Sequence, residues 1–368
     1  MASQASENRI SAGDRTLSRE KLLALSLLRH TVLGEIRTVL SERLGYLEAT
    51  PSTLVNIAGS CENPQASFKV NYYGRPAYLS QSAQLQLEAL VLRLRRGFFT
   101  VNNSFREEHF EDPETQGRRL SEFTLIEAEK PEMEEYMGEV RPQNTLQALM
   151  HEQQIVIARV LEKVLADNRE DIPKLCQEYH GRGMSQIEYL GQVFLLTLGN
   201  IAQWTYDEAL ERLNASSLAK QRGKSYVFGD DLGTLEEREL IRQNNGMPLF
   251  VTHHPASLKF FNMKRTPDLK RVYSVDLLMP QLGETIGGAV REENDNFIRD
   301  QIKTSNVGAF MREQGISFPG PFAEYFRTLE EEPYTRRAGY GIGFERLIGF
   351  LIGSTDILDT VAYRTLQP

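Results

Sequence analysis

Apolar residues recur along the chain at two spacings, and each spacing predicts one kind of element. From about Arg19 they repeat every three to four residues, a helical period that runs as far as Gly45, a residue type that often ends helices. A short strand from Tyr46 to Ala49 follows and ends at Pro51. Residues 1–18 carry almost nothing that could be buried, so we expect a mobile tail there.

A long hairpin is the next feature that the pattern predicts. One strand ends in Phe105 to Glu108, a polar loop follows, and a second strand runs from Glu122 to Glu129. Because side chains alternate along a strand, Arg106 and Glu108 share one face, and Phe123 shares a face of the return strand with further carboxylates. These residue types on one sheet face are typical of a nucleotide site. A solvated hairpin with surface ion pairs would carry them too, so the pattern alone leaves both interpretations open.

Helical periodicity returns from Asn144 to Asn168, with Asn144 as the expected N-cap. We interpret residues 140–200 as a helical insertion on the core, with no visible chemistry. Elsewhere hairpins dominate, and neither an alternating strand–helix–strand pattern nor a Walker-type phosphate loop occurs. The predicted fold class is therefore α+β, an antiparallel sheet flanked by helices.

Composition narrows the class of protein. The chain has 368 residues, of which 40% are hydrophobic, ample for a core in one large domain or two ordinary ones. Its net charge of −8 excludes a global basic field that would attract nucleic acid. No apolar run approaches the ~18 residues of a membrane span, and no signal-peptide pattern begins the chain. With two cysteines far apart and without metal-ligand spacing, we expect a reduced, cytoplasmic protein.

Three groups of residues follow one another in a recognisable order. They are the hairpin runs FREE, RRLSEF and IEAE, the stretch from Val275 to Glu293, and the run GYGIGFER from Gly339 to Arg346. The first and last resemble motifs 2 and 3 of the class II aminoacyl-tRNA synthetases, and the stretch between them is close to the asparaginyl pattern of the asparaginyl and aspartyl branch. The resemblance implies a class II catalytic domain over residues 19–368 and a homodimer through residues 19–51, which look like motif 1.

The resemblance also implies an ATP site on the hairpin and the last motif. Arg106 would bind the α-phosphate and the substrate carboxylate, and Arg346 the γ-phosphate, which would make these two the catalytic residues. Glu108 would bind the adenine amino group and Phe123 would stack on the ring, while one of two loop arginines would reach the terminal phosphates. The implied ATP-binding residues are Arg106, Glu108, Arg118, Arg119, Phe123 and Arg346. Guanidinium groups suit the charge that develops on phosphorus oxygens.

Five positions resemble the family's amino-acid site. Glu62 would hold the substrate α-ammonium, Gln81 would contact the amino acid, and Arg291 would read the side-chain carbonyl. Leu87 stands where aspartyl enzymes have a lysine, which favours a neutral substrate side chain. Arg337 replaces the family's histidine, which favours a negatively charged one, so these two substitutions point in opposite directions.

Two carboxylates, Asp276 and Glu284, match the family's magnesium ligands. Hard carboxylate oxygens suit Mg²⁺ that bridges ATP phosphates. Glu284 and Arg291 are seven residues apart and would lie on opposite faces of a regular strand. A bulge at Gly287 and Gly288 would bring both into one site.

The expected reaction begins with formation of an aminoacyl-adenylate from Mg·ATP and aspartate, asparagine or a close analogue. Motif 1 begins within about 25 residues of Met1, so we expect the family's anticodon-binding domain to be absent. The loop at residues 107–117 would repel a phosphate backbone with its carboxylates, which are Glu107, Glu108, Glu111, Asp112 and Glu114. Both observations favour ammonia or a small amine over tRNA as acceptor, in an asparagine-synthetase-like enzyme. The alternatives are transfer to tRNA, as in the asparaginyl and aspartyl enzymes, and a non-catalytic regulatory paralogue.

Overall fold

The computed structural model describes residues 17–57, 63–108, 117–131, 141–176, 183–332 and 335–363. Glu62, most of the acidic loop and nearly all of the expected N-terminal tail lie outside these residues.

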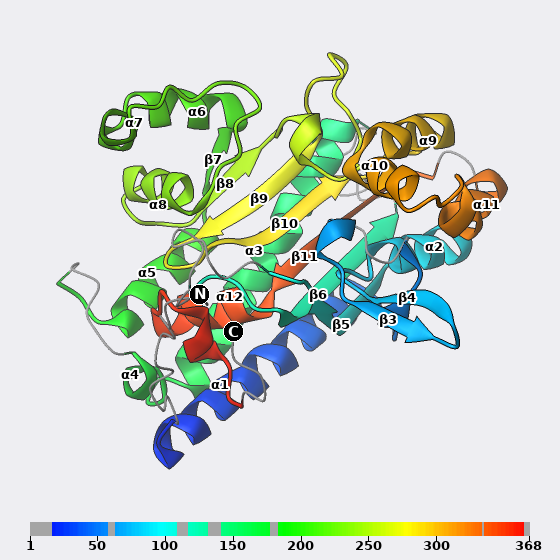
Figure 1. Ribbon diagram of the computed structural model, residues 1–368. Helices are drawn as coiled ribbons and strands as arrows, with labels where there is room; N and C mark the ends of the chain where they lie inside the picture. Colours follow the sequence, from blue (N-terminus) through cyan, green and yellow to red (C-terminus); the bar gives the residue numbers. More distant parts are fainter. Residues whose placement is uncertain are drawn as a thin grey trace, which may run out of the picture.

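An eight-stranded sheet organises the molecule (Figure 1), in the order β1-β5-β6-β11-β10-β9-β8-β7. All neighbouring strands are antiparallel except at the two edges, where β1 pairs with β5 and β7 with β8 in parallel. The strands are β1 Leu47–Glu48, β5 Phe98–Phe105, β6 Glu122–Pro131, β7 Ala202–Thr205, β8 Leu249–Thr252, β9 Ser274–Met279, β10 Gly283–Val290 and β11 Arg337–Gly343. The α+β prediction is confirmed, and the predicted hairpin is the β5–β6 pair.

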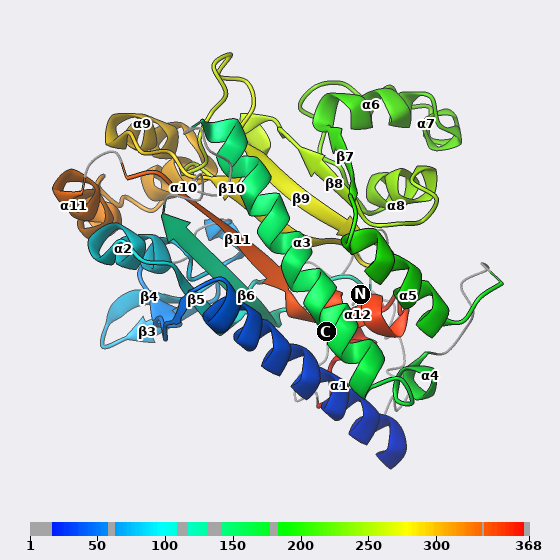
Figure 2. The ribbon, with the colours of Figure 1, turned by 180° about the vertical axis from the view of Figure 1, so that it is seen from behind.

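Two long helices, α1 (Arg19–Thr38) and α3 (Pro142–Asp167), lie across one face of this sheet (Figure 2). The apolar stripe of α1 is fully buried and joins the main core with apolar residues of α3 and α12 (Phe344–Ile352). Ser18 caps α1, which ends in a π-helical turn, Val39–Arg43. The N-cap of α3 is Arg141, not Asn144, because Pro142 occupies the first turn, where its missing N–H has no partner to lose.

Of the remaining helices, α4 (Ile172–Leu175) and α5 (Gln186–Thr197) pack into the main core, and most of the others form two groups at the ends of the sheet (Figure 1). One group packs with β7 and β8 around its own apolar cluster, and the other packs with α2 around a second cluster. The other helices are α2 Gln84–Leu94, α6 Tyr206–Asn214, α7 Ser217–Arg222, α8 Thr234–Gln243, α9 Asp295–Thr304, α10 Asn306–Glu313 and α11 Ala323–Glu331. A small sheet, in the order β2-β4-β3, comprises β2 Leu54–Val55, β3 Lys69–Tyr72 and β4 Arg75–Leu79.

Within the described ranges, none of the helices combines the length and the apolar composition needed to cross a membrane.

Candidate active site

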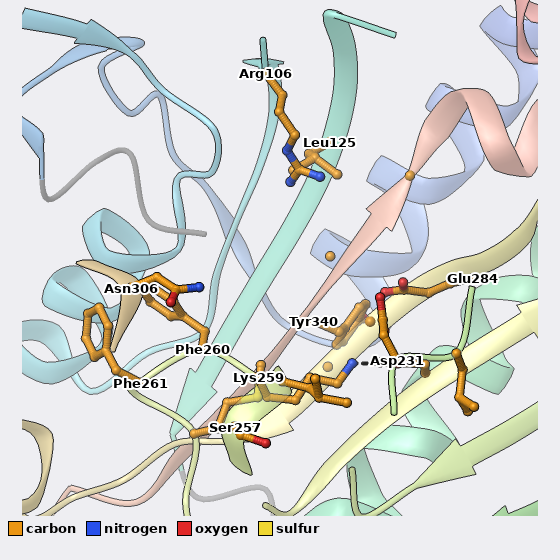
Figure 3. A pocket seen from close by; sticks show the side chains of 18 of the residues that line it. Arg106, Leu125, Asp231, Ser257, Lys259, Phe260, Phe261, Glu284, Asn306 and Tyr340 are labelled. Carbon is orange, nitrogen blue, oxygen red and sulfur yellow. Dashed lines mark hydrogen bonds and ion pairs between the residues drawn. The ribbon is translucent and has the colours of Figure 1, made fainter. Parts of the chain in front are cut away.

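A cavity of about 950 Å³ lies over the central strands, and β6, β9, β10 and β11 all contribute to its wall (Figure 3). The structure brings all the predicted ATP and metal residues to this cavity, together with one of the described residues predicted to bind the amino acid. The predicted residues that line it are Arg106, Glu108, Arg118, Arg119, Phe123, Asp276, Glu284, Arg291 and Arg346. Residues from five separate stretches of the chain therefore meet at one place.

At the hairpin end, the guanidinium of Arg106 lies 5.8 Å from the centre of the Phe123 ring. Glu108 lies between two arginines: Arg119 Nη1 donates to its Oε2 at 2.8 Å, and Arg106 Nη1 is 3.8 Å from its Oε1. This carboxylate is therefore neutralised by its own hairpin. The cavity here presents a cationic guanidinium beside an aromatic face, an arrangement that suits a purine and its α-phosphate.

The two loop arginines differ in their contacts. Arg118 is buried and donates to Glu237 and to the carbonyl of Leu282, whereas the Arg119 side chain is exposed. Glu237, on α8, is a site residue that the sequence analysis missed. Burial raises the pKa of this carboxyl, and the attraction of Arg118 and Arg346 opposes the rise. The available signal was a carboxylate on the same helical face as Leu240, where a buried residue is expected.

Asp276 and Glu284 converge on a space that only a glycine leaves open. A Cβ built at Gly287 would lie 2.7 Å from Glu284 Oε1 and 3.6 Å from Asp276 Oδ1. Two hard carboxylate oxygens around one small open space fit Mg²⁺, whose remaining ligands are usually water and phosphate oxygens. Among the described residues no group of three or more His, Cys, Asp or Glu could hold a metal, so these two carboxylates would act with the nucleotide.

The predicted bulge is present, but at a different residue. β10 slips its register against β9 between Glu284 and Ile286, so the extra residue is Thr285, while Gly287 and Gly288 stay in regular pairing. One inserted residue reverses the alternation of faces that follows it. Glu284 and Arg291 consequently line the same cavity.

Asp276 already has two internal partners. Lys259 Nζ lies 2.6 Å from Asp276 Oδ2, and His254 Nε2 lies 3.1 Å from the same oxygen. Burial lowers the pKa of His254 well below its usual range, and Lys259 lowers it further, so the ring is neutral. Burial also lowers the pKa of Lys259, but the attraction of Asp276, Glu284 and Asp231 outweighs it and the pKa is raised. A charged ammonium and a neutral imidazole therefore hold Asp276.

At the opposite end of the cavity, Arg291 Nε donates to Glu129 Oε1 at 3.0 Å, and both side chains are almost fully buried. Gly339 makes room for this pair, because a Cβ there would lie 2.1 Å from the Glu129 carboxylate. Burial raises the pKa of Glu129 to about 7, although Arg291 opposes the shift. Among the described residues predicted to bind the amino acid, only Arg291 lines the cavity, and above neutral pH Glu129 balances its charge.

Arg337 is the other arginine that the resemblance assigns to the amino-acid site. Its side chain is completely buried and is not among the described residues that line the cavity. Its Nη2 lies 2.7 Å from Glu88 Oε2, to which Tyr325 also donates, while Asn262 donates to the other oxygen. Glu88 also lies 3.9 Å from Arg291 and so connects the two arginines. The sequence analysis missed Glu88, although it is a carboxylate on an apolar helix face.

Two further predicted positions also differ from expectation. Leu87 points away from the cavity and packs with Ala83, Val91 and Phe98, because the helical period places it on the opposite face of α2 from Leu85. Gln81 is buried and donates to the carbonyl of Ala66 at 3.1 Å and to other groups nearby. Neither they nor Arg337 are among the described residues that line the cavity, so the structure does not bring these three to it.

A model of the family described as "tRNA synthetases class II (D, K and N)" matches residues 6–367. The chain belongs to this family. The chain is 30% identical to the cytoplasmic asparagine–tRNA ligase of Saccharomyces cerevisiae over 350 residues, which are 94% of this chain and 55% of the yeast enzyme. It is 32% identical to the probable cytoplasmic asparagine–tRNA ligase of Schizosaccharomyces pombe over 313 residues, 84% of this chain and 47% of that protein. The chain thus spans about half the length of these curated relatives.

Solved structures agree with this assignment. The asparaginyl-tRNA synthetase from Pyrococcus horikoshii, complexed with asparaginyl-adenylate, superposes with a TM-score of 0.73 at 26% identity, over 93% of this chain and 68% of that one. The Entamoeba histolytica asparaginyl-tRNA synthetase in complex with asparaginyl-adenylate gives 0.73 at 25% identity, over 95% of this chain and 68% of that one. The family is one of ATP-dependent, adenylate-forming ligases.

These matches overturn the expectation that ammonia or a small amine is the acceptor. Relatives that cover most of the chain are named asparagine–tRNA ligases. The described part of the acidic loop also carries less net charge than expected, because Glu108, one of its five carboxylates, lies between Arg119 and Arg106. Three of the others, Glu111, Asp112 and Glu114, lie outside the described residues.

Proposed function

We propose that this synthetase activates asparagine with ATP as asparaginyl-adenylate and transfers the asparaginyl group to tRNA. The observation that carries the choice of amino acid is the internal charge balance around Arg291. Relatives named asparagine–tRNA ligase support the choice of tRNA as acceptor.

Adenylate formation needs two reactants held in line and charge stabilised on the α-phosphate, with no side-chain nucleophile. Arg106 would bind the substrate carboxylate and the α-phosphate together, and Phe123 beside it would stack on the adenine. Arg346, whose Nη1 donates to the Glu284 carbonyl, would bind the γ-phosphate. Asp276 and Glu284 would hold Mg²⁺, which neutralises phosphate charge when bound.

Charge balance favours asparagine over aspartate. The two buried arginines at this end, Arg291 and Arg337, face two buried carboxylates, Glu129 and Glu88. A substrate carboxylate would add a third negative charge to two positive ones, and burial makes an unbalanced charge costly. An amide adds none and can accept a hydrogen bond from Arg291. Leu87 favoured a neutral substrate side chain and Arg337 a negatively charged one. Neither residue is among those that line the cavity, so this disagreement does not weigh against asparagine.

We further propose that the synthetase is a homodimer through residues 19–51 and works in the cytoplasm. The outward face of α1 exposes Leu22, Leu23 and Leu27, and Leu47 follows on β1, so apolar area remains for a second copy to cover. The Saccharomyces cerevisiae relative is named as cytoplasmic, which supports the same compartment here.

Transfer of radiolabelled asparagine to total tRNA tests the proposal. Purified protein with Mg·ATP should yield labelled tRNA whose label is released as asparagine by mild base, because an aminoacyl ester is base-labile. The Arg106→Ala variant is the negative control. Labelled adenylate without labelled tRNA would overturn the proposed acceptor, and no labelled product of either kind would overturn the proposed activity.

A further inference from the structure

Lys259 follows the 3₁₀ turn Ala256–Leu258 and lines the cavity, extending toward the side where Glu284 and Asp231 lie (Figure 3). Its side chain is only 18% exposed, and its Nζ lies 2.6 Å from Asp276 Oδ2. None of the ATP, amino-acid or metal roles described above uses this lysine. The buried ammonium of Lys259 therefore pairs with Asp276, one of the two proposed metal ligands, and no role described so far explains this pairing.

The lysine and a divalent cation would compete for the same carboxylate. Mg²⁺ sits 2.0–2.1 Å from its oxygen ligands, and two cations around one carboxylate repel each other strongly in a partly buried site. His254 would stay beside Asp276 if the ammonium left, because its Nε2 lies 3.1 Å from the same carboxylate oxygen. The exchange of one cation for another is therefore possible without rebuilding the site.

A flexible four-carbon stem carries the ammonium, so it can change partner by rotation alone. Space beside Asp276 and Glu284, kept open by Gly287, is where the triphosphate would lie under the proposed function. Lysine binds phosphate as a point charge. The displaced ammonium would thus remain next to anionic oxygens.

We propose that Lys259 is a phosphate-binding residue that also regulates metal entry: it occupies Asp276 in the free protein and transfers to the triphosphate when Mg·ATP binds. This inference rests on the proposed adenylate-forming function. It assigns Lys259 opposite effects on two ligands, because the lysine excludes the metal from the free protein and attracts the nucleotide.

Binding of Mn²⁺, followed by electron paramagnetic resonance without nucleotide, tests the first effect. Removing the competing cation in Lys259→Met should tighten Mn²⁺ binding by about tenfold or more, because the repulsion between the ammonium and the metal ion is lost. Calorimetric titration with Mg·ATP tests the second effect. The same variant should bind Mg·ATP about tenfold more weakly, since it loses a charged contact to phosphate.

Lys264→Met is the matched control. Lys264 is 20% exposed and lies 2.7 Å from Glu293, so it resembles Lys259 in burial and pairing, but it does not line the cavity. It should leave both affinities unchanged. Lys259→Gln provides a second neutral variant should Lys259→Met fail to fold, and Lys259→Arg should restore most of the Mg·ATP affinity.

The outcomes separate the inference from the proposed function. Mn²⁺ binding that is unchanged or weaker in both neutral variants would show that Lys259 merely supports Asp276, and would overturn the inference. Unchanged Mg·ATP affinity would do the same. Failure of the proposed function would instead appear as wild-type protein that makes no adenylate, whichever way the Lys259 variants behave.

Discussion

The two ends of the cavity carry the same residue types but use them differently. One end, called the phosphate end here, contains Arg346, Glu284 and Lys259. The side chains of Arg346 and Glu284 are 29% and 40% exposed, and Lys259 pairs with Asp276, a carboxylate that a metal ion would also bind.

The other end, called the amino-acid end here, contains Arg291 and, behind it, Arg337. Their side chains are 4% and 0% exposed, and each pairs with a buried carboxylate, Glu129 and Glu88 respectively. The first end can exchange partners with an incoming anion or cation. The second is already neutralised, so under the proposed function it should favour a neutral group.

Removing a charge should have its largest effect on stability at the amino-acid end. Glu88→Ala leaves Arg337 buried without its partner, so we expect a loss of about 3–5 kcal/mol in the free energy of unfolding, measured by urea denaturation. Glu332→Ala is the matched control, because Glu332 pairs with Arg95 at 2.9 Å near the surface, and it should cost less than about 1 kcal/mol. Equal losses in the two variants would contradict the contrast between the ends.

At the phosphate end a removed charge should affect chemistry rather than folding. Arg106→Ala should lower the rate of ATP–pyrophosphate exchange by about 10²–10³-fold, because it removes a donor aimed at developing charge. The melting temperature should stay close to that of the wild type, since the Arg106 side chain is 30% exposed. A variant that exchanges normally would mean that Arg106 is only a surface partner of Glu108.

Filling the space between the two metal ligands should change the magnesium requirement. In Gly287→Ala the new Cβ would lie 2.7 Å from Glu284 Oε1, and the partly exposed Glu284 must move aside. We expect the Mg²⁺ concentration for half-maximal exchange to rise about tenfold, the order seen when a ligand loses its position. Gly191→Ala on α5, where nothing lies within 4 Å of the added Cβ, should leave the requirement unchanged. A normal requirement in Gly287→Ala would place the metal elsewhere.

The smallest expected effect concerns pH. Burial raises the pKa of Glu129 to about 7, so protonation below that pH removes the negative partner of Arg291. An uncompensated Arg291 would accept the carboxylate of aspartate, and the preference for asparagine over aspartate should fall severalfold between pH 8 and pH 6. Glu129→Gln, which stays neutral, should show the weaker preference at pH 8 as well. A preference independent of pH in the wild type would contradict this role of Glu129.

The same contrast explains what could be predicted from the sequence. The hairpin, the glycine-rich last motif and the arginines of the phosphate end occur in short, ordered runs, so their meeting in one cavity was predictable. The Glu88–Arg337 pair joins residues 249 positions apart, and no local pattern connects them. The family resemblance put Leu87 in the site, although the helical period places it on the opposite face of α2 from Leu85. The extra residue in β10 is Thr285, which no pattern in the sequence marks.

The most direct test of the account is the ratio of kcat/KM for asparagine to that for aspartate in ATP–pyrophosphate exchange at pH 8. A neutralised amino-acid end predicts a ratio of at least about 10², because one extra buried charge costs several kcal/mol. Equal values, or a preference for aspartate, would show that Arg291 or Arg337 is available to a substrate carboxylate, and would contradict the central claim.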